Sequence, residues 1–272
     1  MPIEVVPITG SVGAEVRNLD LNDVSIDLAE ELRQVWLDHK VLVIRDQPIS
    51  RNAHIEFRRR FGELEVHPFT ENDGEHPEII VLEAGGQTGS TTVASGWHSD
   101  VTWRAEPSMG SILRGVVVPS IGGDTCFASA SAAYERLDDG WKARVDDLVA
   151  VHDYMLVFGG DVPDGKAEKL REKYPAQRHP VVRTHPETGE RGIFTNRYFV
   201  SHLEGMDCDE SREIIGHLER QIMSPSVQCR IRWQKDTFVM WDNRAVQHAA
   251  TSDFLPRHRR MERVTIIGDR PF

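Results

Sequence analysis

The sequence predicts an α+β protein built on a jelly-roll core, or double-stranded β-helix, with flanking helices and insertions. Many short strand-like segments are present, the helical segments gather in the N-terminal part and in insertions, and the regular βα alternation of a doubly wound fold is missing. We expect residues 1–272 to form one domain, because no Pro/Gly/Ser-rich linker divides the chain and single β-sandwiches or barrels often reach this size.

Four segments have the apolar spacing of helices. In residues 26–40 apolar side chains recur at three- and four-residue intervals, with charged residues between them. Residues 52–61 and 131–149 show similar stripes, and Asp209 is expected to cap a fourth helix. We expect these helices to cover the faces of the sheets.

Strands are predicted before and after these helices. Val41–Ile44 is a short apolar run that suits a buried strand, and residues 227–233 alternate between apolar and polar side chains, as a half-buried strand does. Further strands are expected at residues 111–118, 149–157, 237–241 and 263–267.

Composition limits the class of function. Asp and Glu number 43 against 32 Lys and Arg, and the net charge of −11 argues against a nucleic-acid surface. No apolar run of membrane-spanning length is present, so we expect no membrane partner. Cys126, Cys208 and Cys229 lie far apart in the chain and the start lacks a signal-peptide pattern, which indicates a reducing cytoplasm.

The most informative segment is residues 96–103, GWHSDVTW. In an extended backbone, residues two apart point to the same side, so His98 and Asp100 could present a nitrogen and a carboxylate to one metal ion. A third ligand must come from elsewhere, and His248, which follows a predicted strand, is the best candidate.

Two histidines and one carboxylate leave coordination positions open for O2 chemistry at Fe(II), although zinc in a hydrolase is held by similar sets. The segment after His248 favours iron with a keto acid as co-substrate. Close to the last predicted strand it contains Arg257, Arg259, Arg260 and Arg263, and planar guanidinium groups suit a buried carboxylate.

With these residues, the chain resembles the taurine dioxygenase family of Fe(II)/2-oxoglutarate-dependent oxygenases. The similarity covers nearly the whole length. It is carried by residues 60–64 (RFGEL), 97–102 (WHSDVT), 122–125 (GGDT), 241–244 (WDNR) with His248, and the ending at residues 263–272.

The resemblance implies specific roles for site residues and cofactors. Fe(2+) is the expected metal, and 2-oxoglutarate and O2 are the expected co-substrates. The implied groups are His98, Asp100 and His248 as the catalytic iron ligands, Thr125 and Arg259 for 2-oxoglutarate, and His67, Val101 and Arg263 for the primary substrate.

The implied activity is hydroxylation of a small anionic organic substrate. A taurine-like alkylsulfonate, with release of sulfite and an aldehyde, is the first expectation, and alkyl sulfate esters or aryloxyalkanoates are alternatives. These stay open because Thr70 and Ala94 stand where the taurine enzyme has a Tyr and an Asn that help to bind the amine. The family also suggests a homodimer or homotetramer. Outside this class, a zinc hydrolase or a non-catalytic β-roll binding protein remains as an alternative.

Overall fold

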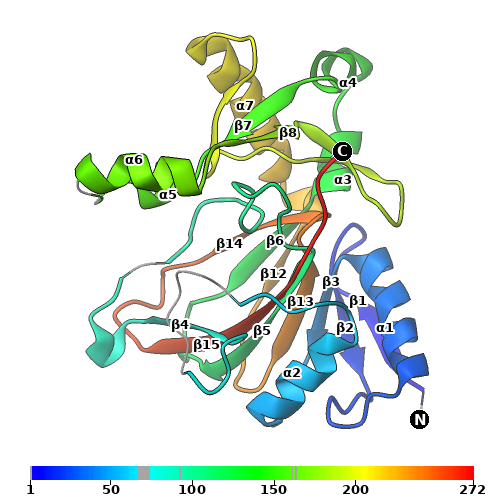
Figure 1. Cartoon of the computed structure of the whole chain (residues 1–272). Helices are drawn as coiled ribbons and strands as arrows, with labels where there is room; N and C mark the ends of the chain where they lie inside the picture. The colour runs from blue at the N-terminus through cyan, green and yellow to red at the C-terminus, as the bar shows by residue number, and fades with distance from the viewer. Residues whose placement is uncertain (1, 67–73, 92, 161, 163) are drawn as a thin grey trace.

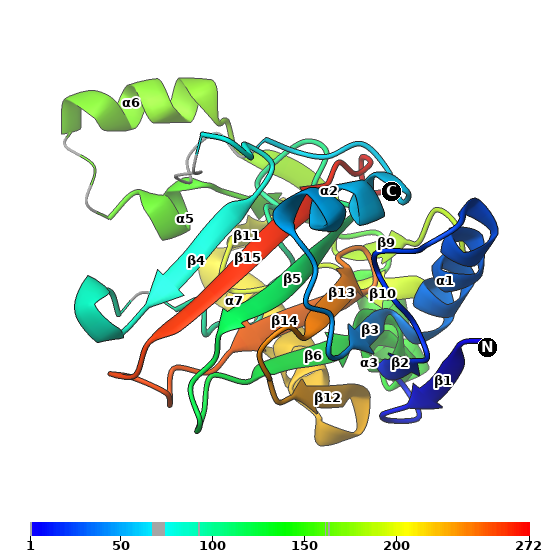
Figure 2. The ribbon, with the colours of Figure 1, turned by 90° about the horizontal axis from the view of Figure 1, so that it is seen from below.

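The centre of the structure, a computed structural model, is a seven-stranded sheet that faces a three-stranded sheet (Figures 1 and 2). The structure describes residues 2–66, 74–91, 93–160, 162 and 164–272. Strands from both ends of the chain lie in the large sheet, in the order β1-β2-β3-β13-β5-β15-β4. Its strands are β1 (Glu4–Pro7), β2 (Ala14–Arg17), β3 (Val41–Ile44), β4 (Ile80–Ala84), β5 (Gly110–Val117), β13 (Phe238–Asp242) and β15 (Arg259–Ile266).

The small sheet has the order β12-β6-β14, and all its pairs are antiparallel. Its strands are β6 (Thr125–Ser129), β12 (Gln228–Ile231) and β14 (Val246–Ala250). Apolar side chains of both sheets form one buried cluster, in which Phe127 of β6 lies with Trp241 of β13 and Met261 of β15. Two facing sheets with a shared apolar interior are the arrangement of a jelly roll, as the sequence predicted.

Helices cover the outer faces of this core (Figure 1). The first two helices of the chain pack on the large sheet. The third and the last helix lie on the side of the small sheet, where they also contact further strands. The helices are α1 (Ile26–His39), α2 (Arg51–Arg59), α3 (Ala130–Glu135), α4 (Asp139–Val145), α5 (Met155–Phe158), α6 (Asp164–Lys173) and α7 (Cys208–Ile222), with 3-10 turns at Gly86–Thr88 and Pro225–Val227.

Two smaller sheets complete the described strands. One has the order β11-β7-β8 and the other pairs β10 with β9. Their strands are β7 (Val149–His152), β8 (Gln177–Pro180), β9 (Val182–Thr184), β10 (Arg191–Ile193) and β11 (Val200–Leu203).

In the described part of the chain, no helix is both long enough and apolar enough to cross a membrane.

Local sequence explains where α1 begins and ends. The Ser25 hydroxyl accepts a hydrogen bond from the Leu28 amide and caps the first turn. Lys40 ends the helix in a left-handed conformation, with φ 65°, and the chain enters β3 at once. The stripe predicted in this helix is buried against the large sheet through Leu32 and Trp36, both at 0% exposure.

Several boundaries differ from the sequence prediction; for example, β15 begins at Arg259 and not at residue 263. The helix expected over residues 131–149 is two helices, because Asp138 accepts from the amide of Trp141 and starts α4 as a new helix. The cap of the last helix is Asp207 and not Asp209, since the Asp207 carboxylate accepts from two amides of its first turn. The strand expected over residues 149–157 ends at His152, and α5 follows it.

Replacing Trp36 with Ala should lower the free energy of unfolding by about 3–5 kcal/mol, the usual range for removing a buried aromatic side chain. Its ring lies edge-on to Phe61, with centroids 5.9 Å apart, and fills the space beside Gly110. Denaturant unfolding measures the loss. The matched control is Ile26→Ala on the same helix. Ile26 is 73% exposed, so this variant should change the free energy of unfolding by no more than about 0.5 kcal/mol. Equal losses of stability in the two variants would contradict the assignment of Trp36 to the core.

Candidate metal centre

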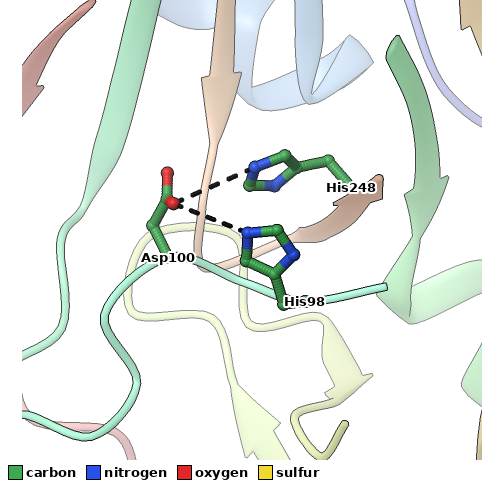
Figure 3. A group of neighbouring side chains, drawn as sticks. All are labelled: His98, Asp100 and His248. Atoms are coloured by element: carbon green, nitrogen blue, oxygen red, sulfur yellow. Dashed lines mark ion pairs between the residues drawn. The ribbon is translucent and has the colours of Figure 1, made fainter. Parts of the chain in front are cut away.

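Three side chains from distant segments meet between the two sheets (Figure 3). His248 lies on β14, whereas His98 and Asp100 lie on the segment between β4 and β5. The Nε2 atoms of His98 and His248 are 3.8 Å and 3.9 Å from Oδ1 of Asp100. The three donor atoms all lie within 4.8 Å of one another. Because nitrogen and oxygen ligands lie roughly 2 Å from such an ion, one metal can bind all three.

Backbone pairing holds the two histidines together. His98 and His248 form an isolated antiparallel bridge, with N–H···O distances of 3.1 Å and 2.8 Å in the two directions. Their ring centroids are 4.4 Å apart. The bridge lies on the edge of β14 opposite to β6, and it places both imidazoles on one side of the paired backbones.

The protonation states suit a metal ligand set. Burial lowers the pKa of His98, and burial together with the nearby His98 ring lowers the pKa of His248 to about 3. Burial raises the pKa of Asp100, but Arg263 and then the two histidines outweigh it and hold that pKa well below its ordinary value. At neutral pH the site therefore has two neutral imidazoles and one carboxylate, which is the form that binds a cation.

Neighbouring groups orient these ligands. Nδ1 of His98 lies 2.7 Å from the carbonyl oxygen of Gly96, to which it can donate, and this leaves Nε2 free as an acceptor facing Asp100. Tyr198 stacks on the His98 ring at 4.7 Å. Ser111 donates to the other carboxylate oxygen of Asp100 at 3.3 Å. Ser111 and Tyr198 were not expected from the sequence, since neither stands in a motif that points to metal chemistry.

Arg263 lies at the site, in direct contact with a metal ligand. Its Nη1 atom is 3.0 Å from Oδ1 of Asp100, and its Nε atom is buried without a hydrogen-bond partner among the described residues. Its guanidinium group therefore supplies positive charge beside the metal ligands. The substrate-binding role expected for Arg263 stays a prediction.

A second arginine lies on the same face of β15. Arg259 is 8% exposed, and among the described residues no carboxylate or other acceptor pairs with it. Burial lowers its pKa to about 10, so it remains a cation at neutral pH. Its guanidinium group packs near the rings of Trp233 and Phe254, at 5.9 Å and 5.8 Å. A buried, unpaired guanidinium fits the distal carboxylate of a keto acid.

Thr125 lies near this arginine through a shared neighbour. The indole N–H of Trp233 donates to the Thr125 hydroxyl at 3.0 Å, and Arg259 packs on the same indole ring. Gly123 allows the close approach, because a Cβ there would lie 3.2 Å from Cδ of Arg259. The structure thus brings the two residues expected to hold 2-oxoglutarate to one place, and their role stays a prediction.

Val101 and His67 complete the expected substrate residues. Val101 is buried beside Asp100, and its backbone has φ 49°. The extended backbone assumed from His98 to Asp100 is therefore wrong beyond Ser99, because a turn begins at Asp100. His67 lies outside the described residues, as does Thr70.

An apolar cluster borders the metal ligands. It contains Val101, Trp103, Tyr154 and Phe199, and Phe199 packs edge-on against His98 with centroids 6.1 Å apart. Trp103 also lines a surface cavity of about 490 Å³. The surroundings of the ligand set are thus cationic toward β15 and apolar toward this cluster.

A buried set of two histidines and one carboxylate, inside a jelly roll and with an unpaired arginine nearby, defines the class of non-haem Fe(II) oxygenases that use a keto acid. Comparison with known proteins agrees. The family model described as "Taurine catabolism dioxygenase TauD, TfdA family" matches residues 4–265. The chain belongs to this family.

Individual relatives match over nearly the whole chain. An alkylsulfatase of Acinetobacter baylyi is 33% identical over 96% of this chain and 84% of its own. An alpha-ketoglutarate-dependent sulfate ester dioxygenase of Pseudomonas putida is 32% identical over 100% of this chain and 91% of its own. The crystal structure of a taurine dioxygenase from Burkholderia xenovorans has a TM-score of 0.85 at 33% identity, covering 99% of this chain and 90% of that one.

These findings confirm the predicted enzyme class. The protein is an alpha-ketoglutarate-dependent dioxygenase, with Fe(II), 2-oxoglutarate and O2 as cofactor and co-substrates. A zinc hydrolase and a non-catalytic binding protein lose their support, since the matching family model is one of dioxygenases and the relative from Pseudomonas putida is named as an alpha-ketoglutarate-dependent dioxygenase.

Replacing Asp100 with Ala should abolish metal binding, because two neutral imidazoles alone leave the ion without its anionic ligand. Anaerobic titration with Co(II), followed by visible absorption of the bound ion, measures the dissociation constant. Asp20→Ala serves as the control, since Asp20 is exposed and outside the site. Tight binding by the Asp100 variant would remove Asp100 from the ligand set.

Replacing Arg259 with Ala should raise the KM for 2-oxoglutarate at least tenfold, because losing one partner of a buried charge pair costs about 2 kcal/mol or more. Succinate formation at varied 2-oxoglutarate measures it. Arg260→Ala is the matched control: the next side chain on β15 points to the opposite face and lies 3.8 Å from Glu83 and 3.9 Å from Glu262. Equal effects at both positions would refute the assignment of Arg259.

Proposed function

We propose that this dioxygenase oxidises an alkyl sulfate ester, releasing sulfate and an aldehyde. The observation that carries the proposal is the position of Arg263, whose guanidinium group lies 3.0 Å from the ligand Asp100 while an apolar cluster borders the ligand His98. A cation and an apolar wall at one metal site suit a substrate with an anionic head and an alkyl chain.

Two further observations support an alkyl chain over an aminoalkyl chain. Ala94 offers no polar side chain at the position where the taurine enzyme has an Asn, and the cluster of Val101, Trp103, Tyr154 and Phe199 is apolar or aromatic. The two relatives named above as an alkylsulfatase and a sulfate ester dioxygenase are 33% and 32% identical to this chain.

The chain's own residues position the reactants in this proposal. His98, Asp100 and His248 hold the iron, Arg259 and Thr125 hold the distal carboxylate of 2-oxoglutarate, and Arg263 with His67 holds the sulfate group. The iron with 2-oxoglutarate and O2 supplies the oxidising power for the C–H bond, with succinate and CO2 as the other products. The apolar cluster keeps water from the reacting carbon. The hydroxylated ester then collapses to the aldehyde and sulfate.

A taurine-like alkylsulfonate, the first expectation from the sequence, is the second candidate. It likewise presents a negatively charged SO3 group to Arg263, but it would release sulfite in place of sulfate. The likeness to the taurine dioxygenase structure from Burkholderia xenovorans favours it.

The deciding experiment supplies Fe(II), 2-oxoglutarate and O2 with hexyl sulfate, taurine or 2,4-dichlorophenoxyacetate as the third reactant. We expect substrate-dependent succinate formation to be fastest with hexyl sulfate, with one sulfate released for each succinate. Faster turnover of taurine with sulfite release would move the assignment to the second candidate. Phenol release alone, or succinate formation that no substrate accelerates, would overturn both.

The variant Arg263→Ala tests the proposed anchor in the same assay. Its KM for the sulfate ester should rise by an amount equivalent to about 2–5 kcal/mol, the range for truncating one partner of a buried charge pair. Slow succinate formation without substrate oxidation should persist. The Co(II) dissociation constant is measured alongside, because Arg263 also contacts Asp100. An unchanged KM would exclude Arg263 from substrate binding.

We also propose that residues 1–272 act as one catalytic domain, in the cytoplasm, as a homodimer or homotetramer. The large sheet combines β1–β3 with β13 and β15, which supports one domain, and the three cysteines are free, which suits a reducing compartment. The assembly rests on family analogy alone, and analytical ultracentrifugation distinguishes the two forms from a monomer.

A further inference from the structure

Asn243 lies in the turn between β13 and β14, five residues before the ligand His248. It is 1% exposed, and its amide group makes three hydrogen bonds to backbone atoms. Its Oδ1 accepts from the Asp100 amide at 2.6 Å, and its Nδ2 donates to the carbonyl oxygens of Asp100 and Ser108 at 3.0 Å and 2.9 Å. One side chain thus satisfies both backbone groups of a metal ligand.

The residue after Asp100 has a strained backbone. Val101 has φ 49°, in the left-handed region that β-branched residues rarely adopt. Such a conformation persists only where the surroundings impose it. Val101 is not a glycine, and it is buried at 8% exposure. Neither the freedom of a glycine backbone nor that of a solvent-exposed loop therefore accounts for this conformation.

Hydrogen bonds hold the chain on both sides of Val101. Before it, Asn243 binds Asp100. After it, the Thr102 hydroxyl lies 2.9 Å from Nδ1 of His152, and Nε2 of His179 lies 3.0 Å from the carbonyl oxygen of Thr102. Because these partners stand on β7, β8 and the β13–β14 turn, the rigid strands around the segment fix its path.

We propose that Asn243 is a positioning residue for the metal centre. By holding the N–H and C=O groups of Asp100, it maintains the left-handed conformation at Val101 and aims the Asp100 carboxylate at the two imidazoles before any metal binds. Since Asn243 and His248 belong to the same turn and strand, the bond also couples the two segments that carry the ligands. This role of Asn243 in metal binding is independent of which substrate the enzyme oxidises.

The test is metal affinity in variants of the whole chain. Asn243→Ala should raise the dissociation constant of Co(II), measured without O2, about tenfold or more, the usual effect of losing a group that orients a ligand. Gln47→Ala is the matched control. The buried Gln47 amide likewise makes three hydrogen bonds to backbone atoms, of Leu19, Leu21 and Arg45, and none of them belongs to the metal centre. It should lower the melting temperature and leave the Co(II) constant unchanged.

A second variant separates positioning from simple loss of structure. Glycine adopts φ 49° without strain, so adding Val101→Gly in the Asn243→Ala background should tighten Co(II) binding by at least about threefold relative to Asn243→Ala alone. A merely structural role for Asn243 predicts no such rescue. Unchanged affinity in Asn243→Ala, or a double variant that stays as weak as Asn243→Ala, would overturn the proposal.

Hydrogen exchange of the unaltered protein gives a test that does not depend on the variants folding. If Asn243 holds Asp100 in advance, the Asp100 amide proton is protected from exchange in the metal-free protein. Exchange at the rate of an open loop, with protection only after Co(II) is added, would show that the metal and not Asn243 orders the segment.

Discussion

The metal centre depends on one backbone contact, the antiparallel bridge between His98 and His248. Two reciprocal hydrogen bonds join a loop to the edge of the small sheet and bring two imidazoles from distant parts of the chain face to face. Asp100 follows two residues later and turns back toward them. Because β14 is fixed by its pairing with β6, the loop takes its position from the jelly-roll core.

Strand β15 divides charge between its two faces. Arg259 and Arg263 point inward; Arg259 has no hydrogen-bonding partner among the described residues, and Arg263 contacts a buried carboxylate. Arg260 and Glu262 lie in ion pairs on the outer face of the sheet. A chain with a net charge of −11 thereby builds a locally positive interior. The alternation of a strand is enough to separate the arginines proposed to bind anions from those that form ion pairs on the outer face of the sheet.

Part of this could be predicted from the sequence. The apolar spacing located α1 and β3, and the residue types at His98, Asp100 and His248 indicated one metal site that the structure brings together. The predicted helix boundaries were wrong where a single capping residue decides them, as at Asp138. The turn at Asp100 was missed because a positive φ at a valine has no signature in residue type; it arises from tertiary contacts alone.

Asp100 also links the two halves of the proposed chemistry. Its Oδ1 atom lies 3.0 Å from Arg263 and 3.8 Å and 3.9 Å from the two imidazoles, so one carboxylate oxygen faces both the metal position and the proposed substrate anchor. A bound cation draws on the same negative charge that pairs with Arg263, which weakens that pair and leaves the guanidinium group more available to a substrate anion. Effects of substitutions at Asp100 and Arg263 should therefore not add, because the two groups share one interaction.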